Sequence, residues 1–333
     1  IKEVKGEKTA VYAGSLTTLG QMYFSVGNCE EAINHYNKAK SIFLDLRLRT
    51  MDVATVYNNL GLCYFGAGDY ENANATYLEA FNIVEELEQI GTHFYSKLIS
   101  NIAVLSQVEG DYESSKTLHE QSLSILFDLN LSNTIEYAEG LFVYGSLLKD
   151  LGRYDNALYE VNNAKKLYDK FLEPDHLKYA DINALLAELY LINGETKEAL
   201  KYYEQAAQLF KEKTPGYGYA LNGLGNTYQV LGDFEKALQY YLEAQKYLKI
   251  SLSESHKDFG ITIMNIATVK ASLGEYLEAF DFYSYAIDVI TNSIGRENTT
   301  YGQLCLGLLD VIYIVPTINM KDYHDLSDNS VSI

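Results

Sequence analysis

The amino-acid sequence predicts an all-α fold, an α-solenoid built from antiparallel helix pairs. A glycine recurs at an almost constant spacing, and small residues recur at fixed distances from each of these glycines. Proline is rare, with 3 in 333 residues, which favours helix. Internal repetition with a period of roughly 20–50 residues is typical of stacked helix pairs.

A glycine followed by a polar residue marks the turn inside each predicted pair. The turn glycines are Gly27, Gly68, Gly110, Gly152, Gly194, Gly232 and Gly274, at spacings of 41, 42, 42, 42, 38 and 42 residues. We expect each glycine to be left-handed and to end the first helix of its pair, helix A. A following Asp or Asn can then cap the second helix, helix B.

Small residues flank every turn at three positions, and large residues stand between them. Gly, Ala or Ser lies seven residues before, five after and twelve after each turn glycine, for example at Gly20, Ala32 and Ala39. Small side chains let two helices approach closely. A large residue such as Leu19 stands eight before, and the position nine after is Tyr in five repeats and His119 or Val161 in the others. These positions are the predicted core.

The chain shows no Pro/Gly/Ser-rich linker and reads as one continuous solenoid over residues 1–314. One more step of 42 residues places the next turn at Pro316, so residues 299–314 are predicted to form a half-repeat helix that caps the array. Residues 315–333 read as a polar, disordered tail. The short step falls at Lys211 to Gly218, which we interpret as a short glycine-rich connection and a candidate hinge.

The charge balance restricts the class of partner. The net charge is −19, from 45 acidic and 26 basic residues. Such a field repels phosphates and anionic headgroups, so nucleic acid and membranes are not expected as partners. Three distant cysteines, Cys29, Cys63 and Cys305, show neither a disulfide framework nor zinc spacing, which suits a reducing, cytoplasmic compartment.

Catalytic signatures are missing from the sequence. It contains no phosphate-binding glycine loop, nucleophile elbow or zinc motif. The six histidines are scattered along the chain and form no metal-ligand pair, at His35, His93, His119, His176, His256 and His324. We therefore expect no enzyme activity, no cofactor and no metal site.

The pattern resembles the tetratricopeptide repeat, most clearly in the segments Tyr57–Phe81 and Leu221–Gln245. The usual unit has about 34 residues, and the longer unit seen here is similar to that of the kinesin light chain group. The resemblance covers about residues 9 to 314. It implies a right-handed superhelix of about seven units plus the capping helix, with an inner wall formed by the A helices.

The resemblance also implies which residues line that wall, namely those thirteen, ten, six, three and two positions before each turn glycine. Amide side chains among them can donate to and accept from a peptide backbone, and phenylalanines can supply apolar pockets. The candidate binding residues are Gln21, Phe24, Asn58, Phe65, Gln107, Phe142, Asn222, Asn226 and Gln229.

The leading functional hypothesis is a non-catalytic scaffold that binds a peptide or helix of a partner protein in this groove. Chaperone-binding members of the family use a lysine ten residues before the glycine, and none stands there in this chain. The wall carries Lys97 and Lys149 against Glu139, Asp150, Asp181 and Glu188. The expected partner segment is therefore neutral or basic, with apolar anchors.

Two alternatives stay open. One is a sensory or regulatory repeat segment that controls a linked or bound effector, such as a protease or signalling enzyme. The other is assembly into a homo-oligomer through the end repeats, which lack an obviously polar outer cap.

Overall fold

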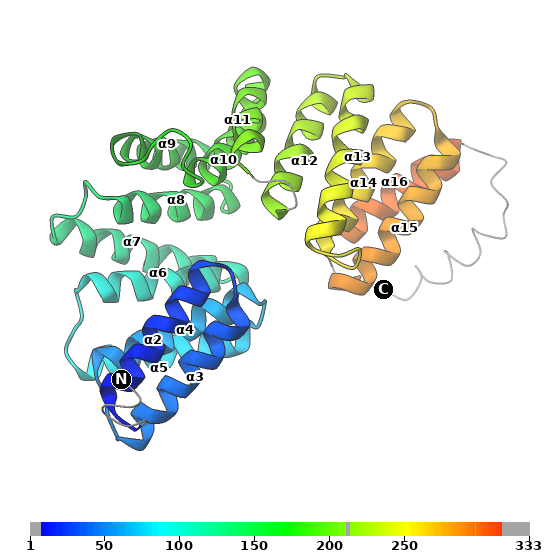
Figure 1. The fold of residues 1–333 in the computed structure, drawn as a ribbon. Helices are drawn as coiled ribbons and strands as arrows, with labels where there is room; N and C mark the ends of the chain where they lie inside the picture. Colours follow the sequence, from blue (N-terminus) through cyan, green and yellow to red (C-terminus); the bar gives the residue numbers. More distant parts are fainter. Residues whose placement is uncertain (1–7, 211–213, 297, 315–333) are drawn as a thin grey trace. The chain divides into compact units, whose positions relative to one another are not determined.

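The computed structural model describes residues 8–210, 214–296 and 298–314, and in these ranges it contains fifteen α-helices and no strand (Figure 1). The sequence-based prediction of an all-α repeat solenoid is confirmed. The half-repeat helix predicted for residues 299–314 and all seven turns lie within these ranges, whereas the tail predicted for residues 315–333 lies outside them.

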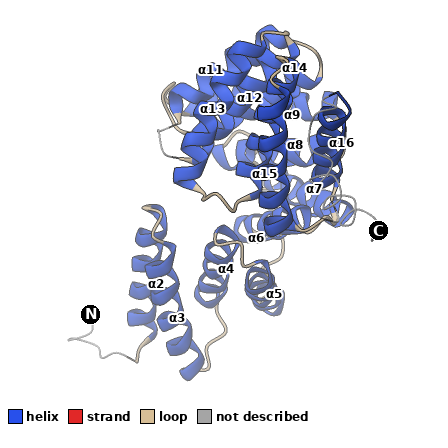
Figure 2. Ribbon diagram, turned by 90° about the vertical axis from the view of Figure 1, so that its right-hand side faces the viewer, coloured by secondary structure: helices blue, strands red, loops and turns tan. Residues whose placement is uncertain are grey.

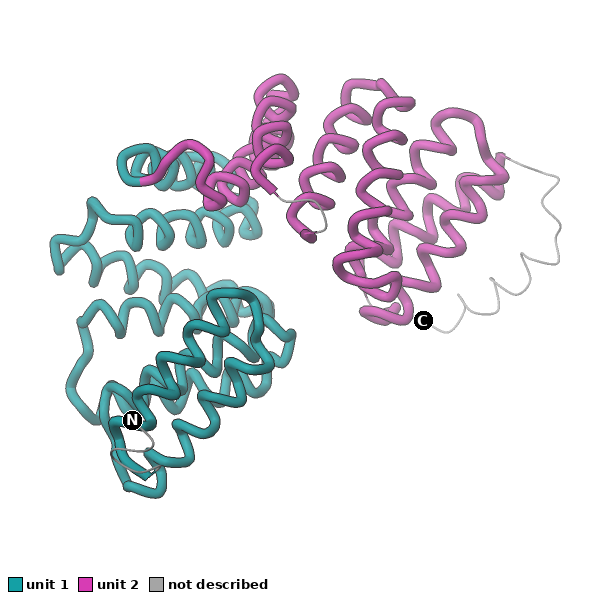
Figure 3. The backbone as a smooth tube through the Cα atoms, in the orientation of Figure 1, with its two compact units in different colours: residues 1–171 teal, residues 172–333 magenta. Residues whose placement is uncertain are grey.

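The chain divides into two compact units, residues 1–171 and 172–333 (Figure 3). Unit 1 holds four helix pairs: α2 (Ala10–Ser25) with α3 (Cys29–Asp45), α4 (Met51–Gly66) with α5 (Tyr70–Glu86), α6 (His93–Val108) with α7 (Tyr112–Asp128), and α8 (Ile135–Asp150) with α9 (Tyr154–Phe171). In each pair the even-numbered helix is helix A.

Unit 2 holds three pairs and one further A helix. They are α10 (Lys178–Ile192) with α11 (Thr196–Leu209), α12 (Pro215–Val230) with α13 (Phe234–Ser251), α14 (Lys257–Ser272) with α15 (Tyr276–Ile294), and α16 (Thr299–Ile314). Within each unit, every helix packs against its neighbours in sequence, and short loops join them (Figure 2).

The turn inside each helix pair forms as its glycine predicts. All seven turn glycines have positive φ, between 71° and 86°, which favours a residue without a Cβ atom. Asn28, Asp69, Asp111 and Asp233 each accept a hydrogen bond from the backbone N–H three residues later. Glu195 and Glu275 make no such bond, because the longer side chain is a poor N-cap.

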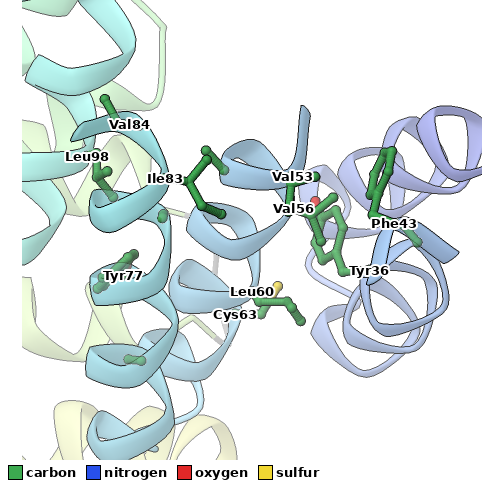
Figure 4. Packing of buried hydrophobic residues seen from close by; sticks show 14 of the residues in the cluster. Tyr36, Phe43, Val53, Val56, Leu60, Cys63, Tyr77, Ile83, Val84 and Leu98 are labelled. Atoms are coloured by element: carbon green, nitrogen blue, oxygen red, sulfur yellow. The ribbon is translucent and has the colours of Figure 1, made fainter. Parts of the chain in front are cut away.

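The core consists of the predicted small and large positions. All 21 small positions are buried, and so is every residue nine positions after a turn glycine. Figure 4 shows part of this core in unit 1, where Tyr36, Leu60 and Tyr77 pack between successive helices. Leu19 departs from the pattern, since its side chain is 37 % exposed. It lies in the first helix pair that the structure describes.

The glycine-rich connection predicted at Lys211 to Gly218 is different in the structure. Residues 211–213 lie outside the described ranges, and Pro215, Gly216 and Gly218 belong to the first turn of α12. Proline is well suited to the first helical position, because its φ is fixed and its missing N–H is not needed there. The 38-residue spacing arises largely because α11 is short: it has 14 residues, whereas α3, α5 and α7 each have 17.

No helix in the described part of the chain combines the length and the apolar character that a membrane crossing requires.

Candidate partner-binding surface

All nine candidate binding residues lie on A helices, but they fall into two sets. Unit 1 carries Gln21 and Phe24 on α2, Asn58 and Phe65 on α4, Gln107 on α6 and Phe142 on α8; unit 2 carries Asn222, Asn226 and Gln229 on α12. In unit 1, each of these A helices packs against the next A helix along the chain. The six residues there therefore lie on neighbouring helices.

The candidates differ in how far solvent reaches them. Gln21, Phe24 and Asn226 are exposed, whereas Asn58 is 3 % exposed. The others, Phe65, Gln107, Phe142, Asn222 and Gln229, are half-buried.

In unit 1, two of the predicted amides join successive A helices. Asn101 Nδ2 donates to Asn58 Oδ1 at 2.9 Å, which links α6 to α4. Gln107 Nε2 donates to Asp150 Oδ2 at 2.7 Å, which links α6 to α8. Both pairs are 43 residues apart. Asn58 is thus a buried contact between helices, and Gln107 both fixes the helix register and reaches the surface.

The amides of α12 in unit 2 also have internal hydrogen-bond partners. The Tyr241 hydroxyl lies 2.7 Å from both Asn226 Oδ1 and Gln229 Oε1, so its single proton is shared between two acceptors. Burial raises the pKa of Tyr241, which keeps this hydroxyl protonated. Asn222 Nδ2 donates to Thr262 Oγ1 at 2.6 Å, while its buried Oδ1 has no hydrogen-bond partner.

Sequence reasoning missed the partners of these amides. Asn101 and Asp150 each stand one residue later than a 42-residue step from Asn58 and Gln107. A search for polar residues at this offset position would have found both pairs. Neighbouring A helices are displaced along their axes, so the residues in contact are not those at equal repeat positions.

A separate pocket of about 300 Å³ lies within unit 1, between α6, α7 and α8. Its lining includes Lys97, Ser100, Val104 and Glu139, which the resemblance placed on the inner wall, but none of the nine candidates. Among the described residues, no group of three or more His, Cys, Asp or Glu side chains is placed to hold a metal ion.

Family models for the tetratricopeptide repeat match residues 11–86 and 136–212, and a second such model matches residues 184–247. Together these ranges include more than half of the chain. Repeats of this kind generally serve as protein–protein interaction scaffolds.

Two known proteins with similar sequences are longer than this chain. Protein kinesin light chain-related 2 of Arabidopsis thaliana is 22 % identical over 311 residues, which cover 91 % of this chain and 46 % of the relative. The chain therefore spans about half the length of such relatives. Response regulator aspartate phosphatase H of Bacillus subtilis is 25 % identical over 227 residues, which cover 66 % of this chain and 59 % of that protein.

Solved structures agree on the fold. The crystal structure of a Rap protein complexed with competence and sporulation factor has a TM-score of 0.64 at 12 % identity, covering 96 % of this chain and 89 % of that one. Helix pairs, left-handed turn glycines and buried small positions recur along the chain. The chain belongs to the tetratricopeptide repeat family and resembles its kinesin light chain group.

Proposed function

We propose that the chain is a non-catalytic scaffold that binds a peptide or helix of a partner protein along the A helices of unit 1. The observation that carries this proposal is the hydrogen-bonded register of α4, α6 and α8. Asn58 to Asn101 and Gln107 to Asp150 hold three neighbouring A helices at a fixed displacement. A partner segment that crosses these helices would therefore meet a preorganised surface, which lowers the entropic cost of binding.

Apolar anchors and amides are both available on this surface. Phe24 is 38 % exposed, and Phe65 and Phe142 are half-buried, so each aromatic ring still offers area to a partner. Exposed Gln21 can pair with a peptide backbone without regard to sequence. Phenylalanine anchors surrounded by polar groups are typical of protein interfaces.

The charge distribution favours a neutral or basic partner segment. The whole chain carries −19, and the Asp150 carboxylate on α8 accepts from Gln107 and lies 3.6 Å from Lys149 Nζ. An acidic segment would be repelled during encounter, whereas a basic one would be attracted more strongly at low salt.

Short synthetic peptides of acidic, neutral and basic composition, each with and without a Leu or Phe anchor, test the proposal by fluorescence anisotropy. We expect basic or neutral anchored peptides to bind most tightly. Phe24→Ala combined with Phe142→Ala should weaken them by at least about tenfold, because two anchors are lost. Tyr159→Ala is the matched control, since this aromatic on helix B α9 is 66 % exposed. Tighter binding of the acidic set, or equal loss in the control, would contradict the proposal.

A second candidate is a regulatory segment that controls a linked or bound effector enzyme. The match to the B. subtilis protein named as a response regulator aspartate phosphatase supports it. Affinity purification from the native cell, followed by assays of the recovered enzymes, tests this candidate. A rate that changes when purified chain is added would support regulation, and unchanged rates for every recovered enzyme would argue against it.

A further inference from the structure

The pocket between α6, α7 and α8 is bordered by a glycine at a position that is large and apolar in several other repeats. Twelve residues before the turn glycine, three repeats carry Val56, Leu98 and Ile182, all fully buried, while the others carry Ser15, Ala220 and Thr262. The fourth repeat has Gly140 at that position, and Gly140 borders the pocket. A Cβ atom at residue 140 would lie 2.9 Å from Leu123 Cδ2 on α7, so the glycine makes room for that leucine beside the pocket.

The floor of the pocket is polar and closed by hydrogen bonds. Ser96 on α6 and Ser122 on α7 are 1 % and 3 % exposed. Their hydroxyl oxygens lie 2.9 Å apart, and each hydroxyl also lies within 3.1 Å of the other residue's carbonyl oxygen. Other repeats have alanine where Ser122 stands. The floor therefore offers hydroxyl oxygens with remaining lone pairs rather than an apolar surface.

Above the floor, the polar lining includes several hydrogen-bond acceptors. Glu136 and Glu139 on α8 contribute two carboxylates, and Ser100 and Asn101 on α6 contribute a hydroxyl and an amide oxygen. Asn101 donates through Nδ2 to Asn58, which fixes the position of its amide group in the lining. Lys97 is the one permanently charged cation in the lining. Val104, Leu126 and Val143 supply apolar contact.

We propose that this pocket binds an arginine side chain of the partner segment. A guanidinium presents five N–H donors and no acceptor, in a planar fork that matches carboxylates. Its alkyl stem can lie along the three apolar side chains while its head meets the acceptors. This inference rests on the proposed scaffold function and deepens it by naming one residue that the partner must supply.

The positive charge of Lys97 repels a guanidinium group in the pocket, but the exposed position of its side chain weakens this repulsion. Its side chain is exposed, so the ammonium can turn into solvent when a cation enters. Removing it should strengthen binding of a guanidinium, because one repulsive charge is lost while both carboxylates remain.

Methyl NMR on the full chain tests the pocket with small probes, because methyl groups of Val104, Leu126 and Val143 lie in its lining. The probe is N-acetyl-arginine methylamide, and the matched control is its citrulline counterpart, which has the same length without the charge. We expect the arginine probe to shift these three sets of methyl signals and to bind at least about tenfold more tightly than citrulline. Lys97→Ala should increase that affinity, and Glu136→Gln should decrease it several-fold.

Two variants test whether the probe binds inside the pocket or elsewhere on the chain. Ser100→Met places into the pocket a side chain that the seventh repeat carries at the equivalent position, Met264, and should abolish the shifts. Glu85→Gln removes an exposed carboxylate on α5 outside the pocket and should leave them unchanged. Equal binding of citrulline, or arginine binding that survives both Ser100→Met and Glu136→Gln, would overturn the pocket assignment.

The same probes separate this inference from the scaffold proposal. If anchored peptides bind through Phe24 and Phe142 but are indifferent to replacement of arginine by citrulline, the scaffold stands and the arginine pocket is wrong. If the arginine probe binds in the pocket but no peptide binds, the pocket stands and the scaffold proposal is wrong.

Discussion

The ring of Tyr36 on α3 lies directly against the backbone of Gly20 on α2, and a Cβ atom at residue 20 would be 2.6 Å from Tyr36 Cε1. The same relationship joins Tyr77 to Gly61 and Tyr241 to Gly225. In the fifth and seventh repeats, alanine replaces this glycine, at Ala187 and Ala267. There, Tyr203 and Tyr283 lie against a glycine of the following A helix instead, Gly223 and Gly307.

This contact predicts opposite effects for two glycines of the same helix. Gly20→Ala should lower the free energy of unfolding by about 1–3 kcal/mol, because the new methyl group overpacks the Tyr36 ring. Gly14→Ala, where no atom lies within 4 Å of the added Cβ, should raise it by about 0.5–1 kcal/mol through helix propensity. Urea denaturation of both variants checks the pair. A stabilising Gly20→Ala would refute the close contact.

His119 makes stability depend on pH. Burial lowers the pKa of His119 from 6.5 to about 4, so the unfolded chain binds its proton first as the pH falls. Stability is then fully present above pH 6.5 and declines towards pH 4, by about 3 kcal/mol for this group. Thermal unfolding at a series of pH values between these limits measures the loss.

His119→Leu is the variant that isolates this effect. His119 Nε2 is buried without a hydrogen-bond partner, so its removal should stabilise the protein by about 1–3 kcal/mol at neutral pH. It should also reduce the loss of stability between neutral and acidic pH. An unchanged acid profile in His119→Leu would show that other groups cause the profile.

Cysteine reactivity should follow burial. Burial, together with the neighbouring Cys29 thiol, raises the pKa of Cys63 to about 12. At pH 8, about one Cys63 in 10,000 is then a thiolate, so iodoacetamide should label Cys29 and Cys305 well before Cys63. Peptide mass spectrometry follows each site, and denaturant should remove the difference. Rapid labelling of Cys63 in the folded chain would contradict its burial.

Asn58 should act on stability much more than on binding. Asn58→Ala removes the acceptor of the Asn101 amide and should cost about 1–3 kcal/mol. The double variant with Asn101→Ala should cost less than the sum of the two single changes, because the pair is lost only once. Peptide affinity should fall by much less than the tenfold expected for the loss of the two phenylalanine anchors, because Asn58 affects only the preorganisation of the surface. A large loss of affinity at full folding would place Asn58 in the binding surface.

Helix α16 exposes apolar side chains through which the hypothesis of a homo-oligomer can be tested. Leu306 and Tyr313 are 65 % and 91 % exposed, and Leu309 is 49 % exposed. If the end repeat mediates a homo-oligomer, Leu306→Glu with Leu309→Glu should shift light scattering at high concentration to the monomer mass. Leu277→Glu, at a 67 % exposed position on helix B α15, is the control. A monomer at every concentration of the wild type would remove this candidate.

The repeat punctuation was readable from the sequence because it depends on backbone requirements. A left-handed turn needs glycine and a close helix approach needs a small residue, so Gly27 and Ala32 have analogues in every repeat. The binding residues were harder to predict, because the sequence does not distinguish an amide side chain that faces solvent from one that faces a neighbouring helix. Asn58 and Gln21 share a residue class but differ fully in burial.

Neither the pocket nor the division into two units could be predicted from the repeat pattern. Gly140 stands outside the turn and small-residue pattern, and its effect depends on which side chains surround it in three helices. The boundary between residues 171 and 172 falls inside a regular step of 42 residues, so the spacing gives no sign of it.

The repeats differ in whether the tyrosine packs against a glycine of its own repeat or of the next one. Repeats one, two and six contain both the glycine and the tyrosine, so the contact would be kept if such a repeat were moved as a unit. Repeats five and seven borrow the glycine of their successor, through Tyr203 with Gly223 and Tyr283 with Gly307. Deleting α16 would therefore remove Gly307, against which the Tyr283 ring packs. Shortening the array from this end would thus also destabilise the last complete helix pair.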